Sequence, residues 1–532
     1  MNALVGTGKL VRLILRRDRF LLPIWILLFG LLPTTYISAI TELYPTVAQQ
    51  ALYAQTAGAN PTFLSLYGPI WSHDIGGIVT QRAGFLPIMI ALISVLTVIR
   101  HTRTEEEAGR RELLGATVVG RHAGLAAALI VTVVANLLIA GIVFGAFVGQ
   151  DMAVDGSLAL GLEFAFAGIL GAAIGGLGAQ LTTGAGSARG FAIAVLGAFF
   201  VLRVAGDVGG ESSSVSWLSW LSPMGWVQRV RPFGDEQWWT LALVGGLAVV
   251  LFIAAVAISA RRDVAAGVFP PRLGPADAAP SLRSPVALAW RLHRTLLYSW
   301  AAAFAALGLV FGSVAASVQD LLEDSAQIKE MFERIGGGVD IVDVTLATTL
   351  GILGLIATGY AIQATLRMRA EETEGRAEPV LATHVGRLQW VASHVVFALL
   401  GPAVVLAVAG LTAGVTHGAN VGNIGEQVPR VLAGALVQLP AVWVLVGLAL
   451  LLFGLLPRIA AAVWGVFGLF VLLGQVGSFL GLEQWMLDAS PYSHLPLLPG
   501  GEWTATPLLT LLGIALVLGA VGFVGFRRRD VG

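Results

Sequence analysis

Cysteine is absent from this 532-residue sequence, which excludes disulfides, thiolate metal sites and cysteine nucleophiles. Charge is scarce as well: 12% of the residues are charged, against about 25% in an average soluble domain, while 56% are hydrophobic. A water-soluble globule of this size has too much surface to hide so many apolar side chains. The formal net charge is zero, so charge provides no basis for a nucleic-acid partner. The composition indicates an integral membrane protein.

Catalytic and metal-binding motifs are also lacking. The one string that resembles a phosphate-binding loop, residues 6–10, lacks the first glycine and has Leu10 where Ser or Thr should bind Mg²⁺. Any ATP used by this protein must therefore be hydrolysed by another polypeptide. The eight histidines show no spacing typical of a metal site. We expect no catalytic residue, no metal and no cofactor in this chain.

Long apolar runs dominate what is present. A bilayer core about 30 Å thick needs roughly twenty apolar residues in a helix, and unpaired backbone groups are too costly in lipid for other spanning structures. No alternation of period two, typical of a membrane barrel, occurs. The sequence predicts an all-α integral membrane fold with twelve transmembrane helices. They are expected at residues 20–40, 83–99, 123–147, 158–182, 190–206, 240–260, 295–318, 344–366, 391–416, 431–456, 459–481 and 508–526.

Basic residues are distributed unequally between the loops. With the N-terminus inside, 25 of the 32 Lys and Arg residues fall on the cytoplasmic side. The outer loops carry tryptophans instead, as an interfacial belt would. We expect both termini to be cytoplasmic. The first apolar run is too long for the core of a signal peptide, so we expect it to be an uncleaved first span.

An internal repeat relates the two halves of the chain with a shift of 266 residues. The loop 100–121 matches the loop 366–387, and eleven of the 22 paired positions are identical. Each half holds six predicted spans, an even number, so both halves enter the membrane with the same sidedness. This predicts two parallel six-helix repeats related by a pseudo-two-fold axis along the membrane normal.

Domain boundaries follow from the repeat. The first half is expected at 1–260 and the second at 287–532. The segment 261–286 between them contains five prolines among residues 270–285, a density that excludes a packed helix and predicts an extended cytoplasmic linker.

The repeated loop combines acids, arginines and a glycine. Acidic and basic residues stand four apart, acid first, at Glu106 and Arg110, Glu107 and Arg111, and Glu372 and Arg376. This order predicts a short exposed helix, each pair contributing about 0.2–0.5 kcal/mol. Gly109 and Gly375 inside that helix cost up to about 1 kcal/mol each relative to Ala, which suggests that another group approaches the backbone closely. A merely solvated loop is the alternative, and the retention of the pattern in both copies favours a functional role.

The motif E-E-E-x-G-R-x-E-L-L-x-A-T-x-V-G-R, residues 105–121, follows the second of six spans. In this it resembles the permeases of type-two ATP-binding-cassette exporters, above all the fused twelve-span branch described as polyketide-antibiotic or tetronasin-type exporters of high-GC bacteria. The likeness covers nearly the whole chain. It implies that loops 100–122 and 366–387 are coupling helices that dock on a separate ATP-binding subunit. The residues to which the resemblance assigns that role are Glu105, Glu106, Gly109, Arg110, Glu112, Glu371, Glu372, Gly375, Arg376 and Glu378.

The resemblance also implies partners, cargo and location. Two copies of a nucleotide-binding subunit would bind ATP and Mg²⁺, in the plasma membrane of a bacterium. Hydrophobic or amphipathic compounds such as antibiotics and other drugs would be exported, which implies multidrug efflux and antibiotic resistance; lipid-like cargo stays open. The amphipathic segments 9–19 and 287–294 are similar to the elbow helices of that family. The second loop departs from the first at Pro379, which predicts that its coupling helix ends a turn early.

Polar groups within the predicted spans are few. Glu163 and Arg203 lie near the outer ends of their spans. Each either reaches the interface or forms a local ion pair there, or it belongs to the substrate path, and both interpretations stay open. The uncharged candidates for the substrate path are Asn136, Gln363, Gln438 and Gln475, which are as well suited to hydrogen bonds between helices. No acid is predicted deep in the bilayer, and this favours ATP-driven export over an ion-coupled carrier, the main alternative. A membrane scaffold without transport is a weaker third interpretation.

An acidic stretch with a helical apolar stripe occupies the outer loop 320–343. Together with residues 41–82 it is expected either to form a lid over the outer mouth or to lie on the outer leaflet.

Overall fold

The computed structural model describes residues 3–59, 61–115, 117–207, 214–263, 266–269, 276–323, 341–476 and 483–530. Every regular element in these residues is a helix. Internal contacts divide the chain into unit 1, Met1–Gly274, and unit 2, Pro275–Gly532. Most of the acidic outer stretch predicted at 320–343 lies outside the described residues.

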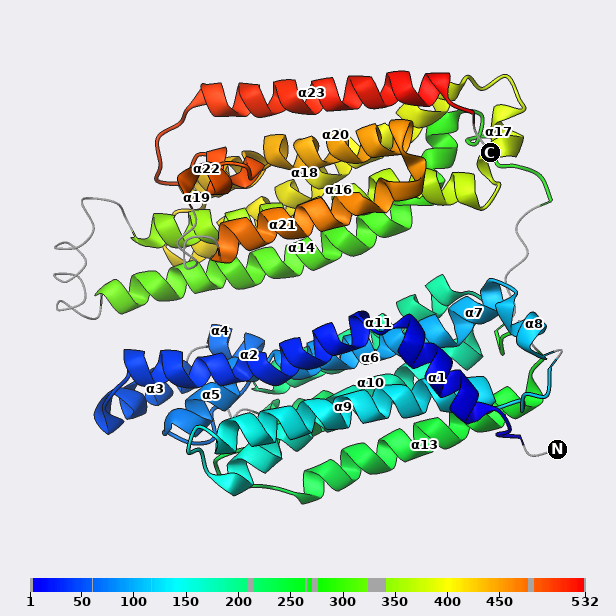
Figure 1. The fold of residues 1–532 in the computed structure, drawn as a ribbon. Helices are drawn as coiled ribbons and strands as arrows, with labels where there is room; N and C mark the ends of the chain where they lie inside the picture. Colours follow the sequence, from blue (N-terminus) through cyan, green and yellow to red (C-terminus); the bar gives the residue numbers. More distant parts are fainter. Residues whose placement is uncertain are drawn as a thin grey trace. The chain divides into compact units, whose positions relative to one another are not determined.

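Unit 1 is a bundle of long helices that run side by side (Figure 1). Its elements are α1 (Thr7–Arg17), α2 (Leu21–Leu43), α3 (Val47–Ala59), α4 (Pro61–Leu66), α5 (Ile75–Ala83), α6 (Leu86–His101), α7 (Arg103–Glu107), α8 (Arg110–Gly115), α9 (Ala123–Val148), α10 (Val154–Leu181), α11 (Ala185–Asp207), η1 (Ser216–Leu221), α12 (Pro223–Gln228) and α13 (Trp239–Arg261). Helix α10 is central, because it packs against α6, α9, α11 and α13. Its small residues permit this: a Cβ on Gly161 would lie 2.7 Å from the carbonyl oxygen of Ala140 in α9.

Unit 2 is built from α14 (Pro285–Glu323), α16 (Ile341–Thr373), α17 (Ala377–Leu381), α18 (Arg387–Asn420), α19 (Ile424–Leu436), α20 (Leu439–Leu455), η2 (Pro457–Ala462), α21 (Val463–Val476), α22 (Gln484–Leu487), η3 (Pro491–His494) and α23 (Ala505–Arg528). The most extensive packing joins α14 to α18 and α20 to α23. Glycines again allow close approach, since a Cβ on Gly308 would lie 2.5 Å from the carbonyl oxygen of Ala409. Residues 287–294, predicted as a separate elbow, are the first turns of α14, which continues without a break into the span.

Eleven helices in the described residues are long and apolar enough to cross a bilayer. The predicted all-helical membrane fold is confirmed, and eleven of the twelve predicted spans have a helix of sufficient length. The remaining one was predicted at 459–481, where the described apolar helix is the shorter Pro457–Val471. Its first turns are a 3₁₀ helix with a non-helical residue at Ile459, and residues 477–482 lie outside the description.

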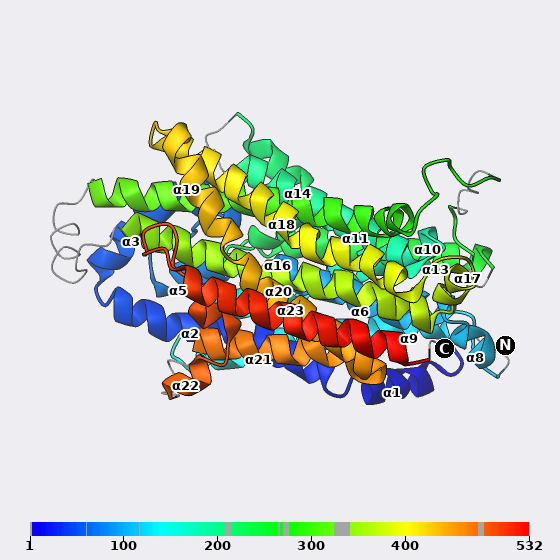
Figure 2. The ribbon, with the colours of Figure 1, turned by 90° about the horizontal axis from the view of Figure 1, so that it is seen from above.

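Both termini lie beside a loop between spans. In unit 1, α7 and α8 lie at the same end as the N-terminus, with α3 at the opposite end (Figures 1 and 2). In unit 2, α17 and the C-terminus share an end (Figure 2). Each repeated loop also contacts the end of the last long helix of its own unit, since Arg121 bonds to Ser259 of α13 and Arg387 bonds to Arg529 after α23.

Candidate functional site

The two repeated loops have related but unequal backbones. In unit 1, Thr102 interrupts the helix between α6 and α7 with φ −119° and ψ −81°. In unit 2, α16 continues through the corresponding positions to Thr373. A glycine then ends the helical stretch in both, and a short second helix follows, α8 or α17. The predicted single helix is thus wrong: each loop is two helical segments joined at a glycine.

Gly109 and Gly375 form these joints because their backbones are left-handed. Both have φ +68°, and the N–H of each bonds to the carbonyl of a glutamate three residues earlier at 3.0 Å. A Cβ at either position would meet nothing within 4 Å. No described group of this chain therefore approaches these glycines, and close approach by another protein stays a prediction. Glycine is used here because an L side chain is strained at positive φ, as at many helix C-termini.

The glycine joint also changes the spacing of the ion pairs. Arg110 donates to both carboxylate oxygens of Glu105 at 2.7 and 2.9 Å, and Arg376 donates to those of Glu371 at 2.9 and 3.1 Å. These partners are five residues apart. The predicted pairs four apart are wrong, because that spacing applies to an unbroken helix and the left-handed residue rotates the following turn.

Glu106 and Glu372, predicted on an exposed helix, are buried, with only 5% and 8% of their surfaces accessible. Glu106 is paired with Arg103 at 2.6 Å, with Arg262 at 2.9 Å and also with Arg111. The carboxylate of Glu372 accepts two bonds from one arginine, Arg529, at 2.5 and 2.7 Å. These two acids hold the loop to the bundle through buried ion pairs.

Arg262 and Arg529 are the residues that the sequence reasoning missed. Each is the C-cap residue of the last long helix of its unit, α13 or α23. The arginine that ends each loop donates to the carbonyl oxygen of that cap residue: Arg121 to Arg262 at 2.7 Å, and Arg387 to Arg529 at 2.9 Å. The repeat shift is 266 residues for the loops but 267 for these caps, so a comparison without a gap does not align them. Their shared place after the last span was the available signal.

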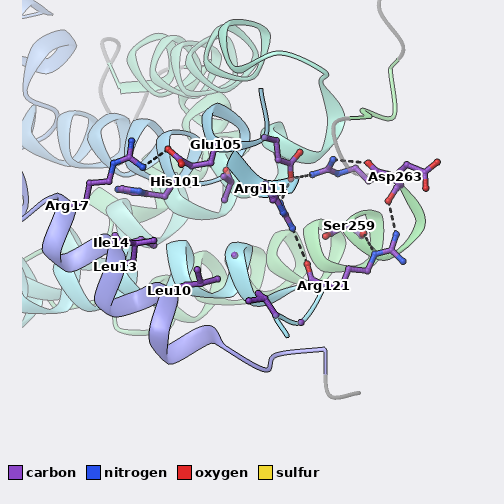
Figure 3. Close-up of a pocket in the computed structure, with 16 residues that line it drawn as sticks. Leu10, Leu13, Ile14, Arg17, His101, Glu105, Arg111, Arg121, Ser259 and Asp263 are labelled. Atoms are coloured by element: carbon purple, nitrogen blue, oxygen red, sulfur yellow. Dashed lines mark hydrogen bonds and ion pairs between the residues drawn. The ribbon is translucent and has the colours of Figure 1, made fainter. Parts of the chain in front are cut away.

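Unit 1 adds contacts from its N-terminal segment. Arg17 of α1 pairs with Glu105 at 2.6 Å (Figure 3). Asp18 bonds to His101 at 2.5 Å. The chain before α1 runs along the end of the loop, where the N–H of Gly120 donates to the carbonyl of Val5 at 2.8 Å. In unit 2, the acid equivalent to Glu105 is paired instead from within α16, by Arg367. The elbow is thus bound to the loop in unit 1.

A cavity of about 490 Å³ lies between α1 and the loop of unit 1 (Figure 3). Apolar side chains of α1, including Leu10, Leu13 and Ile14, form one wall. Ionic groups including Glu106 and Arg262 form the other. It is an amphipathic cavity whose charged wall consists largely of groups that already pair with one another.

The second segment of each loop carries exposed charged residues. Arg110 and Glu112 in unit 1, and Arg376 and Glu378 in unit 2, are exposed. Hydrogen bonds to Glu105 raise the pKa of Arg110, and those to Glu371 raise the pKa of Arg376. Each arginine therefore stays charged at physiological pH. Of the ten predicted residues, these four and Gly375 are exposed, while the others are buried or half-buried.

Pro379 does not shorten the second helical segment of the unit 2 loop. Helix α17 ends at Leu381, the position equivalent to Gly115 at the end of α8. The prediction of an early end is wrong. Pro379 is the third residue of α17, where a backbone N–H has no partner inside the helix and its loss costs little.

The predicted polar residues of the spans are dispersed. Asn136 is buried in α9 and donates to Ser94 of α6 at 3.0 Å, a bond between helices. Arg203 is buried near the end of α11, where it donates to the carbonyl of Leu64 at 3.1 Å and lies 4.0 Å from Asp207. Both residues thus make local structural contacts.

Glu163 differs from the other polar residues. Helix α10 begins at Val154, so Glu163 lies about 13 Å along it at about 1.5 Å per residue. It is buried, and its Oε2 has no hydrogen-bond partner among the described residues.

The glutamines lie in unit 2. Gln363 is exposed and accepts a bond from the indole N–H of Trp300 at 3.3 Å. Gln438 is buried against Gly354. The side chain of Gln475 lies outside the described residues. None of the predicted polar residues lines the cavity beside α1.

Two bundles of long apolar helices, each with an ion-paired loop at one end, define a multi-pass helical membrane protein. The family model described as "Multidrug efflux system permease Rv1217c, C-terminal domain" matches residues 10–258 and 282–527, one segment in each half. The chain belongs to this family of multidrug efflux system permeases. It is 41% identical over 531 residues to the multidrug efflux system permease protein Rv1217c of Mycobacterium tuberculosis (strain ATCC 25618 / H37Rv), covering 100% of this chain and 96% of the relative. The prediction of an efflux permease is confirmed.

Proposed function

We propose that this chain is the transmembrane subunit of an ATP-driven exporter of the type-two ATP-binding-cassette class. Two copies of a separate subunit would bind and hydrolyse ATP with Mg²⁺, in a bacterial plasma membrane. The permease would comprise twelve spans in two parallel six-helix halves, 1–260 and 287–532, with both termini cytoplasmic. The supporting observation is that two loops of the same construction, one in each unit, have their acids anchored and their second segments exposed.

The exposed segments provide the docking surface in this proposal. Each presents an arginine and an acid within three residues, Arg110 with Glu112 and Arg376 with Glu378. A partner with a mixed-charge groove would match either segment, and one kind of partner would fit both because the pattern is repeated. Anchoring by Glu106 and Glu372 would hold the segments in place before the partner binds, which lowers the entropic cost of binding.

The cargo we propose is hydrophobic or amphipathic, and the relative is named as a multidrug efflux system permease protein. Drugs and antibiotics are the expected compounds, and lipid-like molecules form a second class. The scarcity of charge in the spans agrees with such cargo, since a charged compound would need compensating groups along its path.

An ion-coupled carrier is the second candidate, because of Glu163. A buried carboxyl without a hydrogen-bond partner for one oxygen is the kind of group that binds a coupling proton in a transporter. The proposal of ATP-driven export therefore requires that drug transport continue when Glu163 is replaced by Gln.

The test is purification of the chain from its own host followed by reconstitution. We expect an ATPase with a phosphate-binding loop to co-purify at two copies per chain. Vesicles containing the complex should move a fluorescent drug when ATP is added, and Glu163→Gln should leave this transport within about twofold. Transport by the chain alone on a proton or sodium gradient, abolished by Glu163→Gln, would refute the proposal.

A further inference from the structure

We infer that Arg262 and Arg529 join the coupling loop of each half to that half's fourth and sixth spans, so that movement of the loop is delivered to these helices. The inference rests on the proposed function and identifies residues through which it operates. In each unit the contact consists of a loop glutamate, the arginine that ends the loop and the cap arginine of the last helix. This three-residue contact, the clasp, comprises Glu106, Arg121 and Arg262 in unit 1 and Glu372, Arg387 and Arg529 in unit 2.

In unit 1, Arg262 contacts three parts of the bundle. Its guanidinium donates to Glu106 of the loop at 2.9 Å and to Gln180, near the end of α10, at 2.8 Å. Its backbone caps α13, and its carbonyl accepts a bond from Arg121. Arg121 also donates to the carbonyl of Ser259 in α13 at 3.1 Å. The loop is thus held to α13 near both of its ends, and to α10 through the same guanidinium.

Unit 2 repeats this arrangement with different surroundings. Both terminal nitrogens of Arg529 donate hydrogen bonds to Glu372, and the carbonyl oxygen of Arg529 accepts a bond from Arg387. The guanidinium lies over the rings of Phe453, near the end of α20, and Phe526 of α23, at 5.0 and 4.9 Å. Helix α20 belongs to the fourth span of this half, as α10 does in the first. The partner in that span has changed from an amide to an aromatic ring, yet the same three elements meet at one arginine.

The backbones at the two cap residues also agree. Arg262 has φ −97° and ψ 151°, and Arg529 has φ −87° and ψ 158°. A one-residue change in spacing between loop and cap has not altered the pairing. Two units that differ at the elbow, at the start of the loop and in the fourth span retain this contact, which argues against a chance ion pair.

Physical chemistry favours a firm connection. The guanidinium is planar, always charged and suited to two parallel bonds with a carboxylate. Its position at a helix C-terminus is favourable, because carbonyl groups there carry partial negative charge. In unit 1 the helix between the second span and the loop is interrupted at Thr102. The clasp therefore provides a second mechanical connection between the loop and the bundle.

The test uses unit 2, where Glu372 has one close partner; Arg369 lies 3.9 Å away. Arg529→Glu, Glu372→Arg and the double exchange are compared with Arg528→Glu, a control at the exposed neighbouring arginine. Each permease is purified with its ATPase partner and reconstituted. ATP hydrolysis and transport of a fluorescent drug are measured separately, and chromatography and thermal unfolding report folding.

We expect each single reversal to keep the partner and ATP hydrolysis but to lower the drug moved per ATP at least tenfold. The double exchange should restore it to within about threefold of the parent, and Arg528→Glu should leave it unchanged. Parent-like coupling in the single reversals, or a folded double exchange no better than the singles, would overturn the inference alone. If no ATPase accompanies the parent permease, the proposed function fails and the inference fails with it.

Discussion

Removal of the Glu106 carboxylate should destabilise unit 1 far more than an exposed loop acid would. Three arginines surround Glu106, and one of them, Arg103, is completely buried. Breaking a buried ion pair from one side leaves an uncompensated charge and typically costs about 3–5 kcal/mol. A helix pair on a solvated loop is worth only about 0.2–0.5 kcal/mol. The loss of unfolding free energy expected for a buried, ion-paired Glu106 is therefore about ten times that expected for an acid on a solvated loop.

Thermal unfolding of the detergent-solubilised chain measures this difference. For a unit of this size, about 2 °C of Tm corresponds to 1 kcal/mol, so Glu106→Ala should lower Tm by roughly 6–10 °C. Glu112→Ala, which removes an exposed acid from the same loop, should change the free energy of unfolding by no more than about 0.5 kcal/mol. A difference of about 0.5 kcal/mol in the free energy of unfolding corresponds to roughly 1–2 °C of Tm. If the two variants unfold within that interval of each other, Glu106 does not anchor the loop through buried ion pairs.

Three further predictions concern the loops. Gly375→Ala should lower the free energy of unfolding by about 1–2 kcal/mol, because an L side chain is strained at φ +68°; a loss below about 0.5 kcal/mol in the melting curve would contradict this. Gly120→Ala should destabilise by about 1–3 kcal/mol, since its Cβ would clash with the carbonyl of Ala3, whereas the repeat equivalent Gly386→Ala meets nothing within 4 Å and should be neutral in the same melt. In this cysteine-free chain, Glu378→Cys should cross-link to the ATPase partner while Thr46→Cys, exposed near α3, should not, and equal yields would argue against docking at α17.

The two loops of the protein are not equivalent. In unit 1 the loop is bound to α1 and to the N-terminal segment, whereas in unit 2 the corresponding elbow residues belong to α14 and Arg367 of α16 supplies the charge. Glu106 has three close arginine partners and Glu372 has one. Loss of the carboxylate should therefore destabilise unit 1 more than unit 2. Measurement of Glu372→Ala beside Glu106→Ala makes this comparison.

Hydropathy was sufficient to predict the helical membrane fold and eleven of the spans, because the cost of unpaired backbone groups in lipid leaves few alternatives. The repeat and its charged loops were equally visible, since they are properties of residue order. The family match then confirmed the efflux permease. These features are properties of the local sequence and do not depend on contacts between residues that are far apart in the chain.

Contacts between distant residues needed the tertiary structure. The left-handed backbone at Gly109 and Gly375 changed the ion-pair spacing from four residues to five, and no helical rule anticipates a turn inside the motif. One partner of Glu106, Arg262, lies 156 residues away, and Arg529, the close partner of Glu372, lies 157 away. Packing of the last helix beside the fourth span brings these charges together. The sequence shows Glu106 and Glu372 only as acids on a loop. Burial beside the C-terminus of the last helix allows them to hold the loop to the bundle.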